Sequence, residues 1–363
     1  MKLSHNLIQI LLLIGFLFHG QCLCEITKTD SSRSSSGLFA YPVLFYTPET
    51  RWAFGAAMTV YHRSVNNRRP STWIPLLIYT QNKQIITRIT SDLYGPNEKW
   101  QLLAWIGYYD YPDRFFGIGN QTTDQQKETY TAKRFILHLT PKWKIQNNVY
   151  AGIQYEGMHQ QLSDLEENGE LNKRRLPGSR KSIYSGLGCL ISWDTRDNIY
   201  FPVKGRFHQI EFSWFHSAFG SDFNFKRATF DIRRYICIRT RQALAFQVLA
   251  LMIFGIAPFQ SLPDMGNSQI MRGTYEGRFR DNHFLGTQAE YRFFFWGPLG
   301  AVLFGGVGEV AHRLVDFKIN SIKYSAGFGF RLNIDPEERI NLRIDFGYGK
   351  NTSGLYIEIG EAF

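Results

Sequence analysis

Few side chains in this sequence of 363 residues have the types and spacing that catalysis requires. Nine histidines are present, but none stands in a metal-binding pattern such as HExxH, and no glycine-rich phosphate loop occurs. A hydrolase could still assemble serine, histidine and acid side chains from separate loops, and four histidines fall in or near expected outer loops: His159, His216, His283 and His312. Histidines scattered in this way favour ordinary loop positions, so we expect no enzyme, no metal and no cofactor.

Charge recognition is the chemistry that a second group of residues could perform. Residues 271–281 read MRGTYEGRFRD. The guanidinium of Arg272 offers a rigid fork that can fix a long loop to a carboxylate, and Gly273 lets the tip of such a loop turn sharply. A solvated loop arginine beside a turn glycine is the plainer alternative.

Residues 194–198 read DTRDN and predict a tight turn. The carboxylates of Asp194 and Asp197 would flank Arg196, and Asn198 completes the motif. Because Asp and Asn side chains bond their own backbone in turns, we expect a structural role for these residues.

The segments that must position these motifs alternate apolar and polar residues. Residues 340–348 place Ile, Leu, Ile, Phe and Tyr on one face and Asn, Arg, Asp and Gly on the other, which is the period of a β-strand. About sixteen such segments follow one another. Their charged residues lie on the face opposite the apolar one. This charged face would meet solvent in a soluble sandwich and would line a wet lumen in a membrane barrel. The expected lumen charges are Arg88, Asp92, Glu211, Arg227, Asp231, Arg233, Glu290, Arg292, Arg331, Arg343 and Asp345.

The connections between these segments are alternately long and short. Long ones follow odd-numbered segments, at residues 110–129, 161–181, 257–282 and 310–322, whereas residues 146–148 and 296–298 are short connections after even-numbered segments. Long outer loops and short periplasmic turns are typical of bacterial outer-membrane barrels. The sequence therefore predicts an all-β fold, a sixteen-stranded antiparallel transmembrane β-barrel.

The composition supports this prediction. Aromatic residues make up 16% of the chain, which excludes disorder, and beyond the N-terminus no apolar run approaches the roughly 18–20 residues of a membrane-spanning helix. The net charge of +10 fits contact with outer-membrane lipid and acidic lipopolysaccharide better than contact with nucleic acid.

The N-terminus has the layout of a secretory signal peptide, because Lys2 precedes an apolar stretch at residues 7–18. We expect a signal peptide at residues 1–24, a short polar linker at residues 25–37 and the outer-membrane β-barrel domain at residues 38–363. Cys22 and Cys24 lie in poor lipidation sequences, and the distant Cys189 and Cys237 are expected to be packed thiols.

Three motifs together carry a resemblance to a known family. They are SWDTRDNIYFPVKG at residues 192–205, the MRG motif at residues 271–273 and the C-terminal GLYIEIGEAF. In this order they resemble the barrel of the BamA/TamA outer-membrane assembly factors, the bacterial surface antigen family, and the resemblance covers residues 39–363. It implies a sixteen-stranded barrel with a periplasmic DTRDN-type turn and an Arg-Gly motif in the sixth outer loop.

The resemblance also implies that Arg272 pairs with an acidic residue on the inner barrel wall. The family usually carries that acid on the thirteenth strand, in a pattern like F-x-D-x-G, but this chain has Gly306 at the position. Glu290, Glu309 or Asp345 would have to take its place.

At the C-terminus, the resemblance implies a strand that the assembly machinery reads and a weakly paired seam between the first and last strands. Tyr356, Gly360 and Phe363 match this strand signal, with Gly360 at a bend.

The implied function is insertion of outer-membrane proteins or export of polypeptides, with client proteins as partners. Because only about a dozen residues precede the expected first strand, we expect no periplasmic POTRA domains and a separate periplasmic partner instead. A passive pore or structural barrel is the alternative, and an outer-membrane hydrolase a weaker one. The expected location is the bacterial cell outer membrane.

Overall fold

The computed structural model describes residues 35–65, 67, 70–173, 175–179, 181–336, 339–350 and 352–363. The expected signal peptide, with Cys22 and Cys24, and most of the expected linker lie outside the described residues. The first strand begins at Ser35, slightly before the expected barrel start at residue 38.

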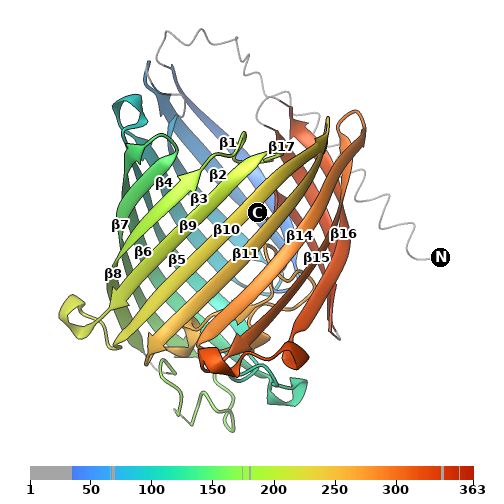
Figure 1. The fold of residues 1–363 in the computed structure, drawn as a ribbon. Coiled ribbons are helices and arrows are strands. Elements are labelled where there is room, and N and C mark those ends of the chain that lie inside the picture. The colour runs from blue at the N-terminus through green and yellow to red at the C-terminus, as the bar shows by residue number, and fades with distance from the viewer. Residues whose placement is uncertain are drawn as a thin grey trace.

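Sixteen antiparallel strands close into one barrel, which confirms the predicted fold (Figure 1). Each barrel strand pairs with the next along the chain, and the last strand lies beside the first. The barrel strands are β1 (Ser35–Thr47), β2 (Arg51–Arg63), β3 (Ser71–Thr80), β4 (Ile85–Tyr94), β5 (Trp100–Phe115), β6 (Glu128–Gln146), β7 (Val149–Ser163), β8 (Ser182–Asp194), β9 (Gly205–Phe215), β10 (Phe225–Arg239), β11 (Gln242–Gly255), β14 (His283–Trp296), β15 (Leu299–Ala311), β16 (Lys323–Asp335), β17 (Ile340–Gly349) and β18 (Thr352–Ile359).

The remaining elements lie in connections. Two short strands, β12 (Asp264–Met265) and β13 (Phe279–Arg280), pair with each other between β11 and β14. Within the described residues, the single-turn 3-10 helices are η1 (Pro96–Glu98), η2 (Asp124–Gln126), η3 (Ser217–Phe219), η4 (Phe259–Ser261), η5 (Leu314–Asp316) and η6 (Ile319–Ser321). Among the residues that the structure describes, no helix is long and apolar enough to cross a membrane.

Alternation along each strand separates two environments. In β16, Tyr324 and Phe330 point outward and are 61% and 50% exposed, whereas Arg331 points into the lumen and is 2% exposed. Strand register places the expected lumen charges on this inner face, opposite the apolar side chains. The outward face is therefore suited to lipid and the inner face to ions and water.

The four long connections that the sequence predicts lie together at one end of the barrel, at the bottom of Figure 1. The same end also carries short turns, between β1 and β2 and between β3 and β4. The hairpin of β5 and β6 is longer than the pattern predicts, because β5 continues to Phe115 and β6 already begins at Glu128. Beyond the bilayer, the outward face no longer has to be apolar, so the alternating pattern fades before the strands end.

The expectation that Cys189 and Cys237 are packed thiols is wrong, since both are exposed. Cys189 lies at an outward position of β8, between the exposed Leu187 and Ile191. On a membrane barrel this face is covered by lipid rather than by protein, so an apolar position there need not be packed within the chain.

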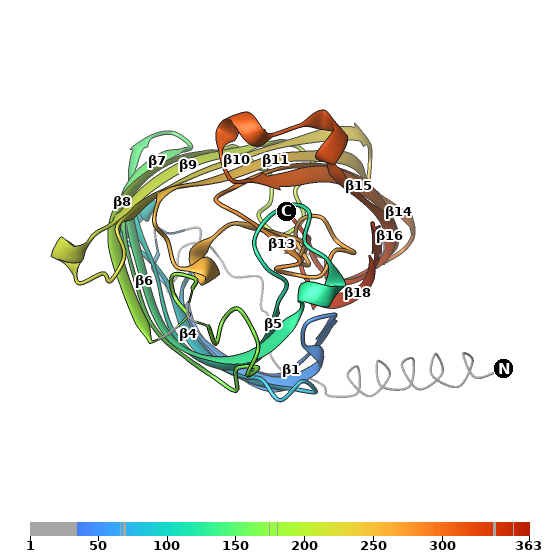
Figure 2. The same cartoon turned by 90° about the horizontal axis from the view of Figure 1, so that it is seen from below.

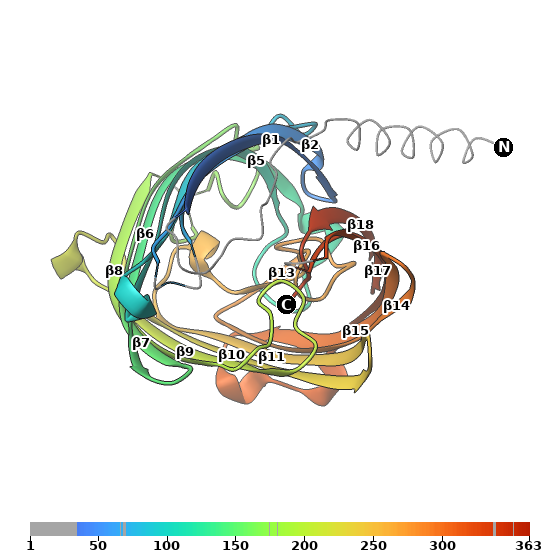
Figure 3. The same ribbon diagram turned by 90° about the horizontal axis from the view of Figure 1, so that it is seen from above.

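Aromatic and aliphatic side chains form a buried cluster at the outer end of the lumen. Phe115, Tyr130, Phe215 and Phe225 come from strand ends, and Phe259 comes from the connection between β11 and β14. The ring of Phe259 lies 5.0 Å from that of Phe115 and 5.8 Å from that of Tyr130. Both end-on views show chain segments folded inside the ring of strands (Figure 2, Figure 3).

Candidate functional site

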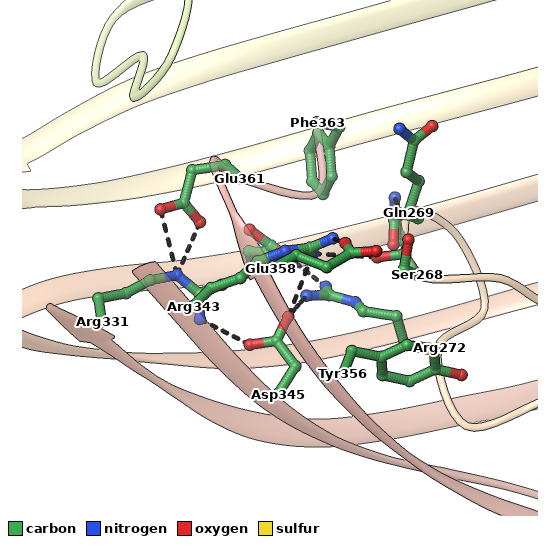
Figure 4. Close-up of polar contacts among 12 residues, drawn as sticks. Ser268, Gln269, Arg272, Arg331, Arg343, Asp345, Tyr356, Glu358, Glu361 and Phe363 are labelled. Atoms are coloured by element: carbon green, nitrogen blue, oxygen red, sulfur yellow. Dashed lines mark hydrogen bonds and ion pairs between the residues drawn. The ribbon is translucent and has the colours of Figure 1, made fainter. Parts of the chain in front are cut away.

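Arg272 lies at the tip of loop six, the connection between β11 and β14 (residues 256–282), and is 1% exposed (Figure 4). Its Nη1 donates to Asp345 Oδ2 at 2.6 Å, and its Nη2 donates to Glu290 Oε1. The guanidinium also lies over the ring of Phe304, 3.6 Å from the centroid. One side chain thus ties loop six to β14, β15 and β17.

Gly273 and Gly347 allow the loop backbone to lie directly against β17. Gly273 has φ of +101°, and a Cβ atom there would lie 2.5 Å from the carbonyl carbon of Gly347. A Cβ atom on Gly347 would in turn lie 2.6 Å from the carbonyl carbon of Arg272. The Gly273 amide donates to the Tyr356 hydroxyl at 3.0 Å, so the tip also contacts β18.

Asp345 is shared by three arginines. Besides Arg272, it accepts hydrogen bonds from Arg331 at 2.6 Å and from Arg343 at 3.3 Å. Arg331 also donates through Nε to Glu361 at 2.8 Å, and Arg343 donates to Glu358. This branch of the network runs from loop six to the end of the chain (Figure 4).

A second branch of the network starts at Glu290 and also reaches the C-terminal tail. Arg292 donates through Nε to Glu290 at 2.7 Å and through Nη2 to the main-chain oxygen of Phe363 at 2.8 Å. The Phe363 ring lies 5.1 Å from the Arg292 guanidinium. The two branches therefore join loop six and the C-terminal tail (residues 360–363) in one network.

Charge balance lets this network lie in the barrel interior. Unpaired buried ions are strongly destabilising, whereas ions with several hydrogen-bonded partners are tolerated. The network contains four guanidinium groups and four side-chain carboxylates: Arg272, Arg292, Arg331, Arg343, Glu290, Asp345, Glu358 and Glu361.

Glu309, the third expected partner of Arg272, lies elsewhere. Its carboxylate accepts hydrogen bonds from Ser321 Oγ and from the Lys318 amide, the latter at 3.1 Å, in the connection after β15. At Gly306, where the family usually has an acid, a Cβ atom would lie 3.0 Å from the carbonyl oxygen of Thr287 and 3.1 Å from Gln288 Cβ, both on β14. This position on β15 carries no acid, and the acids on β14 and β17 hold the arginine.

The C-terminal tail turns into the lumen after Gly360, which has φ of +94° and open space around it. Phe363 is 4% exposed and clusters with Ala362, Tyr235 and Ala245. Figures 2 and 3 both place the C-terminus inside the ring of strands. The terminal aromatic ring therefore faces the lumen.

The seam between β1 and β18 is joined by a single registered pair, Tyr46 with Ile357. By contrast, β1 pairs with β2 along its whole length from Ser35 to Thr47. Because β18 ends at Ile359 and the tail turns inward, the edge of β1 before Tyr46 has no registered partner in β18 among the described residues. Such an edge presents unpaired backbone donors and acceptors.

The DTRDN residues form a turn that bonds mainly to itself. Arg196 donates to Asp194 at 2.9 and 2.8 Å. Asn198 Oδ1 accepts from the amides of Tyr200 and Phe201 at 2.8 and 2.7 Å. These contacts are those of a structural turn.

Asp197 ties this turn to another one. It accepts from the amides of Val203 and Lys204 at 3.0 and 3.1 Å and from Arg339, between β16 and β17, at 2.6 Å. Desolvation raises the pKa of the Asp197 carboxyl, but hydrogen bonds from Lys204, Arg339 and Val203 outweigh it, so the pKa lies below its ordinary value.

Loop six also contacts the first outer turn. The Glu276 amide donates to Glu49 Oε1 at 3.0 Å, and Glu49 is 5% exposed between β1 and β2. Burial raises the pKa of the Glu49 carboxyl, against the effect of this hydrogen bond. The loop thus contacts the β1–β2 turn as well as β17 and β18, which lie side by side in the barrel wall.

The four loop histidines do not assemble into a hydrolytic site within the described residues. His159 lies on β7, and His216 accepts from the Ala218 amide beside η3. His283 and His312 are neighbours, and His312 lies 3.3 Å from Asp281, but no serine, threonine or cysteine hydroxyl or thiol is hydrogen-bonded to either ring in that part of the chain. The described residues also contain no group of three or more His, Cys, Asp or Glu that could hold a metal ion.

Several members of the network were not singled out as site residues from the sequence. Arg292, Arg331 and Arg343 were expected only as lumen charges, and Glu358 and Glu361 were not considered. Their inward positions follow from alternation, but the pairing of Arg331 with Arg343 and of Gly329 with Asp345 depends on register between β16 and β17.

The comparisons with known proteins agree with this architecture. A family model described as the Omp85 superfamily domain matches residues 97–363. BamA from Haemophilus ducreyi lacking POTRA domains 1-3 has a TM-score of 0.62 at 12% identity, over 90% of this chain and 70% of that one. None of the curated proteins compared matches the chain significantly.

Two further solved structures are similar as well. CdiB from Acinetobacter baumannii has a TM-score of 0.56 at 11% identity, and CdiB from Escherichia coli has 0.59 at 10%. Each match covers 88% of this chain, which spans only 59% and 62% of the two CdiB chains. At such low identity, the structural matches show a shared barrel fold.

Proposed function

This chain belongs to the Omp85 superfamily, and from that premise we propose that it inserts outer-membrane proteins or exports polypeptides through its β1–β18 seam. It is a bacterial outer-membrane β-barrel protein. Barrels of this superfamily generally work with client proteins and periplasmic partners. In our proposal, a periplasmic partner helps to deliver a client strand, and the seam receives it.

The seam geometry carries the proposal. A strand edge with free amide and carbonyl groups is a template on which another extended chain can add by main-chain hydrogen bonding. The edge of β1 before Tyr46 has this property, whereas β18 turns away into the lumen at Gly360. A client strand could therefore pair with β1 without first breaking a long ladder.

The contents of the lumen favour this proposal over a passive pore. Loop six reaches across the lumen from Phe259, which packs against Phe115 of β5, to Arg272, which is bound to Glu290 on the other side of the barrel. The cluster around Phe259 lies at the outer end. A permanently open channel would instead need a continuous wet path, as in porins. In planar bilayers we expect closed traces for the intact protein.

Site-specific photo-crosslinking in living cells tests the proposal. A photo-reactive phenylalanine analogue at Leu38, at an outward position on the free edge of β1, should capture client polypeptides. Leu77, at an outward position of β3 and paired with strands on both sides, provides a matched control, because the two leucine side chains are 63% and 57% exposed. Capture of lipid alone at both positions would contradict the proposal and favour a structural barrel.

A further inference from the structure

The connection between β15 and β16, residues 312–322, is the seventh outer loop and lies outside the barrel wall. Both end-on views show its two helical turns, η5 and η6, beyond the ring of strands rather than over the lumen (Figure 2, Figure 3). From the side they lie at the outer end of the barrel (Figure 1). This loop is therefore placed where the outer leaflet of the membrane meets water.

The loop exposes large aliphatic side chains. Val315 and Ile319 are 81% and 91% exposed, and Leu314 and Ile322 are 47% and 40% exposed. Single exposed apolar residues are common on protein surfaces, but a group of four on one projecting segment marks a contact surface.

Hydrogen bonds fix the conformation that exposes them. Glu309 is 5% exposed and accepts from the Lys318 amide and from Ser321 Oγ. Asn120, from the connection between β5 and β6, donates to the Ser321 carbonyl at 2.9 Å. Arg313 donates its amide to Asp316 at 3.1 Å. The outward direction of the aliphatic side chains is thus built into the loop.

The apolar surface of the loop continues the lipid-facing surface of the barrel. Ile322 directly precedes β16, whose outward side chains include Tyr324 and Phe328, 61% and 41% exposed. Any layer of lipid that covers Tyr324 also reaches Ile322. A soluble protein partner would have to compete with lipid at this border.

Basic side chains accompany the aliphatic ones. Arg313 and Lys318 are exposed, whereas the one acid of the loop, Asp316, is paired with Arg313 at 3.1 Å. Among the lysine, arginine and acidic residues of 312–322, two are cations and one is an anion. Aliphatic residues flanked by lysine and arginine suit the boundary between phosphate-bearing headgroups and acyl chains.

We propose that the seventh outer loop is a membrane-surface anchor that inserts Val315 and Ile319 into the outer leaflet at this boundary. The anchor also fixes loop six, because Asn282 donates to the His312 carbonyl at 3.2 Å and Asp281 lies beside the His312 ring. The outer leaflet thereby holds the rim from which loop six enters the lumen.

Fluorescence depth measurement tests the anchor. The protein with Cys189→Ser and Cys237→Ser is given one new cysteine, Val315→Cys, labelled with an environment-sensitive dye and reconstituted into vesicles of phosphatidylcholine and lipid A. Glu167→Cys, exposed in the connection between β7 and β8, is the matched control. We expect a blue-shifted emission and loss of iodide quenching at Val315, with quenching by lipids that carry a nitroxide near the headgroup, and none of these at Glu167.

Two results would overturn the proposal. Iodide quenching at Val315 equal to that at Glu167 means that the loop stays in water. Protection that disappears when the protein is diluted in lipid means that a second copy covers the loop. Ile319→Cys serves as the second labelling position, and the heat-dependent gel shift checks that each variant is folded.

Discussion

The strands at the seam, β1 and β18, are joined differently from those of the longest hairpin, β5 and β6. Every residue of β5 from Trp100 to Phe115 has a registered partner in β6, whereas β1 and β18 share one registered pair. The hairpin is held by its backbone ladder. At the seam, β18 has a full ladder only with β17, and its remaining contacts come from inside the barrel, through Tyr356, Glu358 and the tail residue Glu361. Seam stability should therefore depend on lumen side chains that the hairpin does not need.

Replacing Arg272 should have the largest effect on this difference. Arg272→Ala leaves Glu290 and Asp345 without one of their cations in a buried setting, which should lower the free energy of unfolding by roughly 3–5 kcal/mol. The midpoint of the heat-dependent gel shift measures it.

Arg313→Ala is the control for this variant, because Arg313 forms an exposed ion pair with Asp316 on the barrel exterior. We expect its midpoint to match that of the parent protein. Equal midpoints for the two variants would contradict the role of Arg272 as an anchor.

Gly273→Ala should have the next largest effect. The substitution puts alanine into a left-handed backbone conformation and places its methyl group against Gly347. Together these effects should lower the free energy of unfolding by about 2–3 kcal/mol. Gly220→Ala separates these causes, since Gly220 also has a positive φ but has open space around it. If both variants lose the same stability, the close approach of loop six to β17 is unimportant.

Glu361→Gln should loosen the tail more gently. The substitution removes a charged acceptor of Arg331 while Asp345 remains, so about 1–2 kcal/mol should be lost. Hydrogen exchange should become faster in β18 and stay unchanged in β5. Equal acceleration in both strands would show that the tail does not act on the seam selectively.

The periplasmic turn should be least sensitive. Asp197→Asn weakens one partly exposed ion pair with Arg339 and should change stability by less than about 1 kcal/mol. Because the pKa of Asp197 lies below its ordinary value of 3.8, its contribution is present above that pH and is lost as the pH falls through the lowered pKa. The variant should therefore show a shallower loss of stability in acid, measured by the gel-shift midpoint between pH 5 and about pH 3.

Local patterns predicted the barrel well and the network only in part. Alternation in each strand needs no knowledge of neighbours, so the sixteen strands and the inward positions of Arg331 and Asp345 could be predicted. The partner of Arg272 could not be chosen, because Glu290 and Asp345 meet it only through the path of loop six, across 18 and 73 residues of sequence. Strand register and loop path depend on the whole closed barrel.

The thiols and the seventh outer loop illustrate another limit. Sequence rules for packing assume that apolar side chains are covered by protein. Cys189 is exposed because it lies on the lipid-facing side of the barrel. In our proposal, Val315 is exposed because it enters the surface of the membrane.

A reversible seam lock tests the central claim most directly. In the protein with Cys189→Ser and Cys237→Ser, Tyr46→Cys and Ile357→Cys place two thiols at the registered pair, where strand spacing permits a disulfide. The control lock joins Ala104→Cys and Leu139→Cys, registered partners in β5 and β6. Both carry the photo-reactive residue at Leu38. We predict that oxidation abolishes client capture only in the seam-locked protein and that reductant restores it. Undiminished capture with the seam locked would contradict the account.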